Sequence, residues 1–328
     1  MIVLARSLFR LHALCAALLA LLIGAGAHAQ PIRVGITQIV EHPSLNLIRQ
    51  GFIDRLGELG YPEGTGAVYD IQSAHGEFAT ALTIAQKFLA DNVDFVLAIA
   101  TPSAQAAANV IREIPIIIAG VTDPIAAGLA ESIARPGTNV TGTSDLPPVR
   151  AQLALLKELV PRVRRVGVIY NAGEVNSVVL IDLARKAAAE LGITLVEATV
   201  GSTAEVQQAA QSLLGRVDAI YVQNDNTTAS AIEAVIAVAE RGRLPLITSD
   251  DTVVEKGALG TIGIDYYELG RRTADVAYRV LQGEQPADIP IERIEGQNIF
   301  LNLDVARRLG VTIPDEMTAK AVRIFGEP

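Results

Sequence analysis

Polar side chains follow many of the short apolar runs in this sequence, at the point where each run ends. One run, FVLAIA, is followed directly by Thr101-Pro102-Ser103, and the chain then becomes amphipathic. If a helix begins here, Pro102 lies near its first position, where its missing N–H costs nothing. Free backbone N–H groups, two hydroxyls and the positive end of a helix dipole make an anion site suited to a carboxylate. Alternatively, Thr101 only caps the helix.

Aspartates at other run ends could bind the ammonium group of a zwitterion, because a buried charge without a partner is costly. The candidates are Asp123, Asp225, Asp250 and Asp265. Each has a competing role, since Asp123 precedes Pro124 and fits a turn, and the other three could cap helices. We favour Asp225 and Asp250 as ligand contacts and expect Asp265 on the hinge side.

Further side chains could approach the same ligand. Asn176-Ser177 begins another amphipathic stretch and could contact the ligand from the opposite side or act as a plain helix cap. The segment Glu41-His42-Pro43 and Tyr170 could form the wall that accepts a ligand side chain. A lone loop histidine is more often a surface hydrogen-bonding group, and a tyrosine at a strand end commonly packs on its sheet.

The elements that must position these residues are short apolar strands alternating with longer amphipathic helices. This alternation predicts an α/β fold with parallel sheets covered on both faces and with right-handed crossovers. The expected strands are 32–37, 68–73, 95–100, 116–119, 140–143, 166–170, 194–199, 219–222, 246–248 and 259–264. The expected helices are 44–59, 77–92, 103–112, 150–160, 177–191, 203–214, 228–241 and 266–281.

Ligands of parallel α/β sheets bind outside the carboxyl ends of the strands. The residues that follow the expected strands are therefore the predicted binding residues. They are Gln38, Thr101, Ser103, Thr122 and Asp123 in the first half of the chain, and Asn171, Glu174, Asn176, Ser177, Asp225, Asn226, Ser249 and Asp250 in the second.

The sequence also repeats itself. RVGITQIVEHPS from Arg33 aligns with RVGVIYNAGEVNS from Arg165, and two further strand segments, at residues 93 and 115, match segments at 217 and 245. The matched segments keep their order and lie about 130 residues apart. A repeat of this length indicates two related domains and not a solenoid of short units. Two such domains facing each other form a cleft that suits a small ligand.

The domain boundaries follow from the repeat. After the strand VTGTS the chain enters Asp145-Leu146-Pro147-Pro148, where we expect it to cross into the second domain. We assign residues 30–144 and 266–284 to the first ligand-binding lobe, and residues 145–265 and 285–328 to the second. The tail lies outside the repeat and is expected to form two short strands and a helix centred on 305–309.

The first 29 residues have the pattern of a cleaved secretory signal. Arg6 and Arg10 precede an apolar stretch at 11–23, and small residues end in Ala27-His28-Ala29. The apolar stretch is short for a membrane span of about 20 residues. Cys15 lies inside it, which disfavours a lipid anchor. Cleavage after Ala29 would leave a periplasmic protein without cysteine, and so without disulfides or a thiolate site.

Charge and motifs exclude several functions. The formal net charge of −9 becomes more negative once Arg6 and Arg10 are removed, and no stripe of Lys and Arg suggests nucleic-acid binding. After the signal, His42 and His75 are the only histidines, and H-E-x-x-H, G-x-S-x-G and G-x-G-x-x-G are missing. Asp225 and the pair Asp250-Asp251 could still form a hydrolytic site, but adjacent side chains at a strand end point in different directions. We therefore expect no enzyme, no cofactor and no metal.

Several segments together resemble a known family. They are ITQIVEHPSLN, AIATPSAQAAAN, VTDPIAAGL, NVTGTSDL, VGVIYNAGEVNS, YVQNDNT, TSDD and TIGIDYYELGRRTA. In order and along nearly the whole chain after the signal, they are similar to the ABC transporter substrate binding protein family, which includes tryptophan-binding members. The resemblance implies a type I periplasmic binding fold, with two Rossmann-like domains, three crossover strands and a ligand in the cleft. It also implies an amino acid as ligand, with aromatic ones favoured, and an ABC permease in the inner membrane as partner.

The expected mechanism is capture by closure. The lobes would close by hinge bending near Asp145 and Asp265, with ligand contacts from both lobes favouring the closed form. We expect a monomer that binds a small molecule and no nucleic acid. A ligand-sensing domain for a membrane receptor, or a nucleoside-type ligand, would give the same sequence pattern. A transcription factor of this fold would need a helix-turn-helix module ahead of the first strand.

Overall fold

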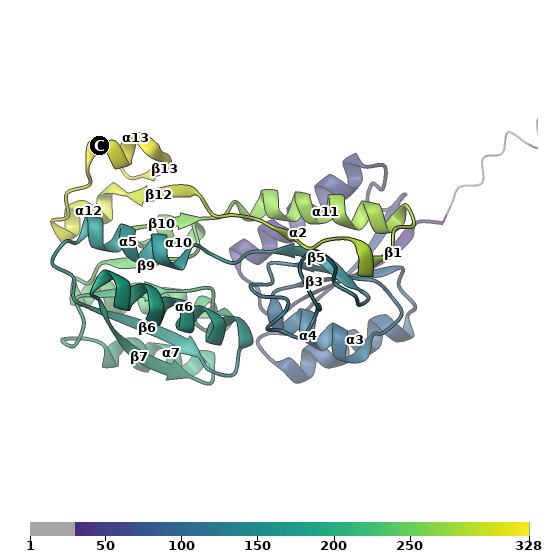
Figure 1. The fold of residues 1–328 in the computed structure, drawn as a ribbon, viewed down its shortest axis with the longest axis horizontal. Coiled ribbons are helices and arrows are strands. Elements are labelled where there is room, and N and C mark those ends of the chain that lie inside the picture. Colours follow the sequence, from purple (N-terminus) through teal and green to yellow (C-terminus); the bar gives the residue numbers. More distant parts are fainter. Residues whose placement is uncertain (1–29, 328) are drawn as a thin grey trace, which may run out of the picture. The chain divides into compact units, whose positions relative to one another are not determined.

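The computed structural model describes residues 30–327, which form two parallel β-sheets flanked by helices (Figure 1). The expected export signal, with Cys15, lies outside the described residues. The first sheet has the order β11 (Glu292–Arg293), β5 (Val140–Ser144), β4 (Ile116–Ala119), β3 (Phe95–Ile99), β1 (Ile32–Gln38), β2 (Ala67–Ser73). The second sheet has the order β13 (Ala321–Phe325), β12 (Asn298–Asn302), β10 (Gly260–Gly263), β9 (Leu246–Thr248), β8 (Ala219–Val222), β6 (Arg165–Asn171), β7 (Thr194–Val200). All paired strands are parallel except β10 and β12.

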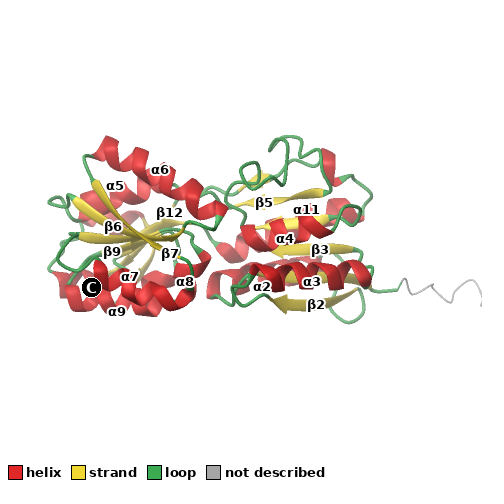
Figure 2. Cartoon of the chain, turned by 90° about the horizontal axis from the view of Figure 1, so that it is seen from below, coloured by secondary structure: helices red, strands yellow, loops and turns green. Residues whose placement is uncertain are grey.

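Helices cover both faces of each sheet, and Figure 2 shows α5 and α6 on one side of the second sheet and α7 and α9 on the other. The first sheet packs with α2 (Pro43–Glu58), α3 (Phe78–Ala90), α4 (Thr101–Val110) and α11 (Tyr266–Leu281). The second carries α5 (Val149–Leu159), α6 (Val175–Leu191), α7 (Val206–Ser212), α8 (Asn226–Ser230), α9 (Ile232–Gly242), α10 (Thr252–Lys256), α12 (Leu303–Leu309) and α13 (Asp315–Lys320). Each sheet has a buried apolar cluster on either face, which explains why its strands are apolar throughout.

The ten expected strands are present within one or two residues of their predicted bounds, and the expected helices are present with two differences. The region 203–214 is a short 3-10 turn, Thr203–Glu205, followed by α7, and the region 228–241 is divided into α8 and α9 at Ala231. The elements α10, α13 and β13 were not predicted. They are five or six residues long, too short for a helical period or a strand alternation to be recognised.

The internal repeat is confirmed by the topology. The order β2-β1-β3-β4-β5 in the first sheet matches β7-β6-β8-β9-β10 in the second. The three pairs of aligned segments therefore contain equivalent strands, namely β1 with β6, β3 with β8, and β4 with β9. Equivalent loops then follow equivalent strands, and both sets lie at the carboxyl ends of their sheets.

The chain passes between the sheets three times, after β5, after β10 and between β11 and β12 (Figure 1). The third passage differs from our boundary at residue 285, because β11 pairs with β5 through Glu292 opposite Thr143. Ile289 and Ile291 are buried just before β11, which holds this segment on the first sheet although β11 itself is only two residues long. We call 32–144 with 266–293 the first lobe, and 145–265 with 294–327 the second lobe.

Two glycines bring α2 and α11 into backbone contact within the first lobe. A Cβ atom added at Gly51 would lie 2.1 Å from the carbonyl oxygen of Tyr267, and one added at Gly270 would lie 2.1 Å from that of Ile48. No side chain fits between the helices at these points. Since α11 begins directly after the second passage between the lobes, this close packing fixes where that passage starts.

We predict that Gly51→Ala lowers the free energy of unfolding by about 1–3 kcal/mol, because the added methyl group forces α2 and α11 apart. Gly57→Ala is the matched control in the same helix. Its added methyl group would lie 3.8 Å from the Cα atom of Pro62, which is ordinary van der Waals contact, and removing a helical glycine gains up to about 1 kcal/mol. Urea unfolding of both variants tests the difference, and equal stabilities would contradict the close packing.

Candidate functional site

A cavity of about 60 Å³ lies between the carboxyl ends of the two sheets. One water molecule needs roughly 10–15 Å³ on the same scale, so the cavity can hold a small solute. Its wall includes residues that follow β1, β3, β4 and β5 and residues that follow β6, β8 and β9. The lining residues are Val40, His42, Ser44, Leu45, Ala100, Thr101, Gly120, Thr122, Asp145, Asn176, Val222, Gln223, Asn224, Asp225, Asn226, Ala229, Ile232, Thr248, Asp250, Val253 and Tyr266.

The N-terminus of α4 contributes Thr101 to this wall. Thr101 is the first residue of the helix and not its cap, and no side chain caps α4. The hydroxyl oxygens of Thr101 and Ser103 are buried and have no hydrogen-bond partner within residues 30–327. Ser103 does not line the cavity. The first turn of α4 contains no acidic residue that would offset the positive end of the helix dipole. This end of the helix can therefore attract an anion.

Ala100, just before α4, has an unusual backbone conformation with φ 73° and ψ 156°. This region is favoured almost only by glycine and costs other residues of order 1–3 kcal/mol. The N–H of Ala100 is held by the carbonyl of Ala119 at 2.9 Å, which ties the strained residue to β4. Strain of this kind concentrates at functional sites, and here it shapes the cavity wall.

Asp145 is the least compensated buried carboxylate of the cavity. It is 5% exposed, and its two oxygens accept from Thr122 Oγ1 at 3.3 Å and from Asn224 Nδ2 at 3.1 Å. Both donors are neutral, so burial raises the pKa of Asp145 to about 6. We had assigned Asp145 only to the hinge. It follows β5, so the rule that picked the other strand-end residues also identifies it.

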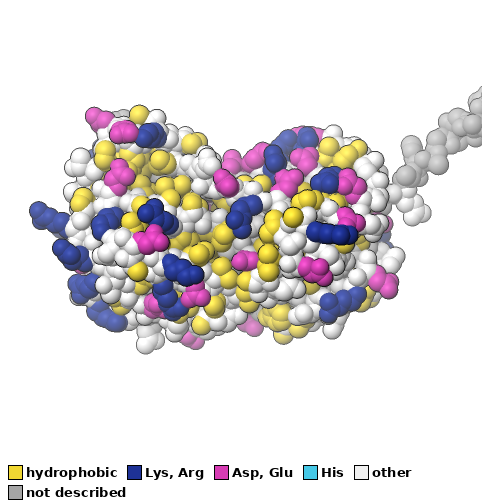
Figure 3. Space-filling view, viewed as in Figure 1, with side chains coloured by type: hydrophobic (Ala, Val, Ile, Leu, Met, Phe, Trp, Pro, Cys, Tyr) yellow, Lys and Arg dark blue, Asp and Glu magenta, His cyan; other side chains and the backbone are white. Residues whose placement is uncertain are grey.

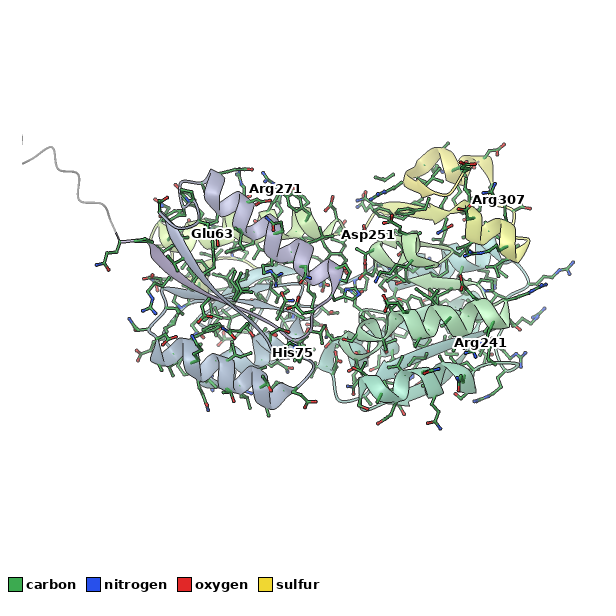
Figure 4. The ribbon with its side chains drawn as sticks, turned by 180° about the vertical axis from the view of Figure 1, so that it is seen from behind. Glu63, His75, Arg241, Asp251, Arg271 and Arg307 are labelled. Atoms are coloured by element: carbon green, nitrogen blue, oxygen red, sulfur yellow. The ribbon has the colours of Figure 1, made fainter. Side chains whose placement is uncertain are left out.

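A second carboxyl with a raised pKa lies close to the passages between the lobes. Asp251, labelled in Figure 4, lies where the second lobe faces the first. Burial and the negative charges of Asp250 and Asp265 raise the pKa of Asp251 to about 7. Buried carboxyls thus gather at the hinge side of the site, and a cation beside them would favour their ionised form.

Asp225 lines the cavity but serves mainly as a structural acceptor. Its Oδ2 accepts from the Asn171 N–H and the Ser177 hydroxyl, both at 2.6 Å, and its Oδ1 accepts from the Thr228 N–H at 2.6 Å. A carboxylate has about four acceptor sites, so little capacity is left for a ligand. Asp225 therefore has the alternative role of a helix cap, at the start of α8.

Asp250 connects the two lobes. Its Oδ1 accepts from the backbone and hydroxyl of Thr252, and its Oδ2 accepts from the Ser44 hydroxyl at 2.5 Å. Ser44 belongs to α2 of the first lobe, so this hydrogen bond crosses the cleft. The ring nitrogen Nδ1 of His42 lies 3.6 Å from the same carboxylate oxygen.

The other two aspartates that we had considered have the alternative roles. Asp265 caps α11 by accepting from the Glu268 N–H at 3.0 Å. Asp123 accepts from the N–H groups of Ile125 and Ala126, each at 3.0 Å, and so forms a turn. Neither residue lines the cavity.

The structure brings six of the thirteen predicted residues into the cavity wall, and the others lie around it. The six are Thr101, Thr122, Asn176, Asp225, Asn226 and Asp250. Asn171 and Glu174 line a separate, wider pocket of about 850 Å³. Ser177 supports Asp225, and Gln38 and Ser249 are buried in hydrogen bonds to neighbours such as Asn46 and Tyr221.

Of the predicted wall residues, His42 lines the cavity, and Glu41, Pro43 and Tyr170 do not. Tyr170 packs in the apolar cluster of the second sheet and donates to Glu197 at 3.0 Å. Sequence reasoning missed further lining residues. They are Ser44, Asp145, Gln223, Asn224, Thr248 and Tyr266 among the polar ones, and Val40, Leu45, Ala100, Gly120, Val222, Ala229, Ile232 and Val253 among the others.

The cavity wall has a polar part and an apolar part. Thr122, Asp145, Asn224 and Tyr266 form one hydrogen-bonded chain, in which Asn224 donates to both Asp145 and Tyr266 at 3.1 Å. Val40, Leu45, Ala229, Ile232 and Val253 supply the apolar part. Such a wall suits a solute with a charged head and an apolar body.

Within residues 30–327, no three His, Cys, Asp or Glu side chains are grouped to hold a metal ion. Nor does this part of the chain contain a helix that is both long and apolar enough to cross a membrane. Acidic and basic side chains are interspersed over much of the face seen in Figure 3.

Two lobes of equivalent topology with a cavity at their facing strand ends define the type I periplasmic binding fold. The family model of the ABC transporter substrate binding protein matches residues 33–324, and the chain belongs to this family.

One relative is a tyrosine-binding protein of Clostridioides difficile (strain R20291), 41% identical over 276 residues that cover 84% of this chain and 80% of the relative. Two solved structures each cover 90% of this chain and 100% of their own. An ABC domain from Streptococcus pneumonia in complex with L-Trp is 34% identical with a TM-score of 0.88. A ligand-free, open substrate-binding protein from Clostridium difficile is 39% identical with a TM-score of 0.68. The higher score with the complex indicates that the lobes here are arranged as in the ligand-bound relative.

We predict that Asp145→Asn stabilises the protein at pH 7.5. Because the pKa of Asp145 is raised from 3.8 to about 6, the folded protein holds a proton between about pH 4 and 6 that the unfolded chain releases. Stability therefore falls as pH rises through this window, by about 2–3 kcal/mol in total. Thermal unfolding should show a higher Tm for the variant at pH 7.5 and no difference at pH 3.5.

Asp225→Asn is the matched control, because it also neutralises a buried carboxylate of the cavity wall. Each Asp225 oxygen accepts from a backbone N–H, so the amide nitrogen leaves one of these buried N–H groups without a partner wherever it is placed. At Asp145 the amide nitrogen can instead donate to the Thr122 hydroxyl, which is able to accept. We expect a loss of about 1–3 kcal/mol at pH 7.5, opposite in sign to Asp145→Asn. Shifts of the same sign in both variants would contradict the distinction between the two carboxylates.

Proposed function

We propose that this protein captures an aromatic amino acid in the periplasm and delivers it to an ABC permease in the inner membrane. The observation that carries the proposal is Asp145, a buried carboxylate with only neutral partners in a cavity that also has an apolar wall. Export rests on the pattern of residues 1–29, and delivery rests on membership of the family.

The ammonium group of the ligand would bind Asp145. Placing a cation beside this carboxylate removes the cost of burying its charge alone and lowers its pKa again. Thr122 and Asn224 already hold the two carboxylate oxygens in place, so the acceptor is oriented before the ligand arrives. Asp225, which we had favoured, is less suited because its oxygens are engaged.

The carboxylate of the ligand would bind the N-terminus of α4. This ten-residue helix has no capping side chain, and the Thr101 hydroxyl has no partner in the described part of the chain. Backbone N–H groups and a hydroxyl at a helix N-terminus are a suitable anion site. Thr101 and Asp145 would thus bind the two charges of one zwitterion.

The side chain of the ligand would lie against the apolar wall. Val40 and Leu45 come from the first lobe, and Ala229, Ile232 and Val253 come from the second. An aromatic ring buries a large apolar area and fits such a wall. The similarity to a tyrosine-binding protein and to a complex with L-Trp supports this ligand class.

Closure would follow from contacts made to both lobes at once. The lobes would rotate about the three passages, near residues 145, 265 and 294–297, as hinges. A ligand shifts this balance only through its difference in affinity for the open and closed forms. Contacts to both Thr101 and the second lobe can form only when the lobes are close, so binding favours closure.

Calorimetry of residues 30–328 with L-Tyr, L-Trp, L-Phe, L-Leu and adenosine tests the proposal. We expect the aromatic amino acids to bind most tightly, and their deamino analogues to bind at least about 100-fold more weakly, because Asp145 then lacks a cation. Amino acid affinity should fall about tenfold per pH unit below pH 6, as protonation of Asp145 competes with binding. Binding of adenosine and of no amino acid would refute the proposal.

A further inference from the structure

His42 has a buried ring nitrogen that nothing in the described part of the chain satisfies. The residue precedes α2 and is 6% exposed in the cavity wall. Its Nδ1 accepts from the Ser44 N–H at 3.4 Å and so caps the helix. Its Nε2 is buried and has no hydrogen-bond partner within residues 30–327.

The helix cap determines which nitrogen carries the proton. Burial lowers the pKa of His42 below 6.5, so the ring is neutral at neutral pH. A neutral imidazole has one donor and one acceptor, and since Nδ1 accepts, Nε2 carries the hydrogen. His42 therefore presents a buried N–H donor that lacks an acceptor, which is a costly arrangement unless a ligand supplies one.

A carboxylate lies beside the other ring nitrogen of His42. Asp250 faces the His42 ring, with Oδ2 at 3.6 Å from Nδ1, and accepts from Ser44 and Thr252. These contacts use three of about four acceptor sites, counting both donors of Thr252, which is the same number as at Asp225, so a single site remains for a ligand. The two residues together offer one donor and one acceptor.

This pair lies beside the apolar part of the wall. Val40 and Leu45 lie within three residues of His42 in the sequence. Val253 lies three residues after Asp250, in α10. Glu233, the neighbour of Ile232, is close enough to influence the charge state of His42. A ligand side chain lying on this wall would end near His42 and Asp250, while its head group lies at Asp145.

We propose that His42 and Asp250 select tyrosine among the aromatic amino acids by binding its phenolic hydroxyl. The hydroxyl oxygen accepts from His42 Nε2–H, and its hydrogen is donated to Asp250. An indole N–H can only donate and would leave the His42 donor unpaired, and phenylalanine offers neither group. The inference rests on the proposed function, since it requires an aromatic amino acid in this cavity.

The test is calorimetry with L-Tyr, L-Phe and L-Trp on the wild type and on His42→Asn. The wild type should bind L-Tyr at least about tenfold more tightly than L-Phe or L-Trp, because a site built to hydrogen-bond a hydroxyl discriminates against ligands lacking it. Asparagine keeps an acceptor for capping α2 but lacks the imidazole N–H. In this variant the preference for L-Tyr over L-Phe should fall to about threefold or less.

The ratio of the two affinities separates selection from a structural role. A variant that only loosens α2 would weaken L-Tyr and L-Phe together and leave their ratio unchanged. His75→Asn is the matched control, because His75 is exposed (Figure 4), lies in no cavity wall and has a φ of 51° that asparagine tolerates. It should keep the wild-type ratio.

Three outcomes would overturn the inference. Equal or tighter binding of L-Phe or L-Trp by the wild type would refute it while leaving the proposed function intact. An unchanged ratio of the L-Tyr and L-Phe affinities in His42→Asn would also refute the inference and leave the proposed function intact. Failure of the wild type to bind any aromatic amino acid would refute the proposed function, and this inference with it.

Discussion

The constraint on which the site depends is the burial of a negative charge at Asp145. The carboxylate is buried at the first passage between the lobes, and within residues 30–327 its side chain accepts hydrogen bonds only from the Thr122 hydroxyl and the Asn224 amide. Such a group destabilises the folded protein until a cation arrives. The rest of the lobe architecture tolerates this cost, since apolar clusters on both faces of each sheet supply the stability. The residue that we propose to bind the ammonium group is thus also one that destabilises the unliganded fold.

The two lobes share a topology but differ in how fully the helix termini at the cavity are hydrogen-bonded. In the second lobe, Asp225 joins β6, α6 and α8 through three short hydrogen bonds, so this side of the cavity is held rigid. In the first lobe, the equivalent helix start at Thr101 has no capping side chain and keeps an unpaired hydroxyl. Two equivalent strands are therefore followed by helices of which one, α8, is capped by a side chain and the other, α4, is not. The uncapped terminus of α4 is the one available to an anion.

The sequence allowed much of the fold and part of the site to be predicted. Apolar strands, helix lengths and the internal repeat were sufficient to predict the two sheets. Burial imposes each of these patterns on the sequence, so each can be recognised without knowing the fold. The rule of strand-end residues selected Thr101 and Asp250, which line the cavity, but it could not separate Asp225, which accepts three hydrogen bonds, from Asp145, which accepts only one on each oxygen. That difference depends on partners distant in the sequence. The apolar wall was not predictable, since Val40 or Ile232 looks like any core residue. The boundary near Arg293 was missed because β11 is only two residues long.

The close contact of α2 with α11 has a consequence for how the chain acquires its structure. These helices are separated in the sequence by residues 59–265, which include most of the second lobe, yet the first lobe cannot complete its core until Gly270 reaches Gly51. The first lobe is therefore built from two distant pieces of sequence, and a chain cut before residue 270 would leave one face of α2 uncovered.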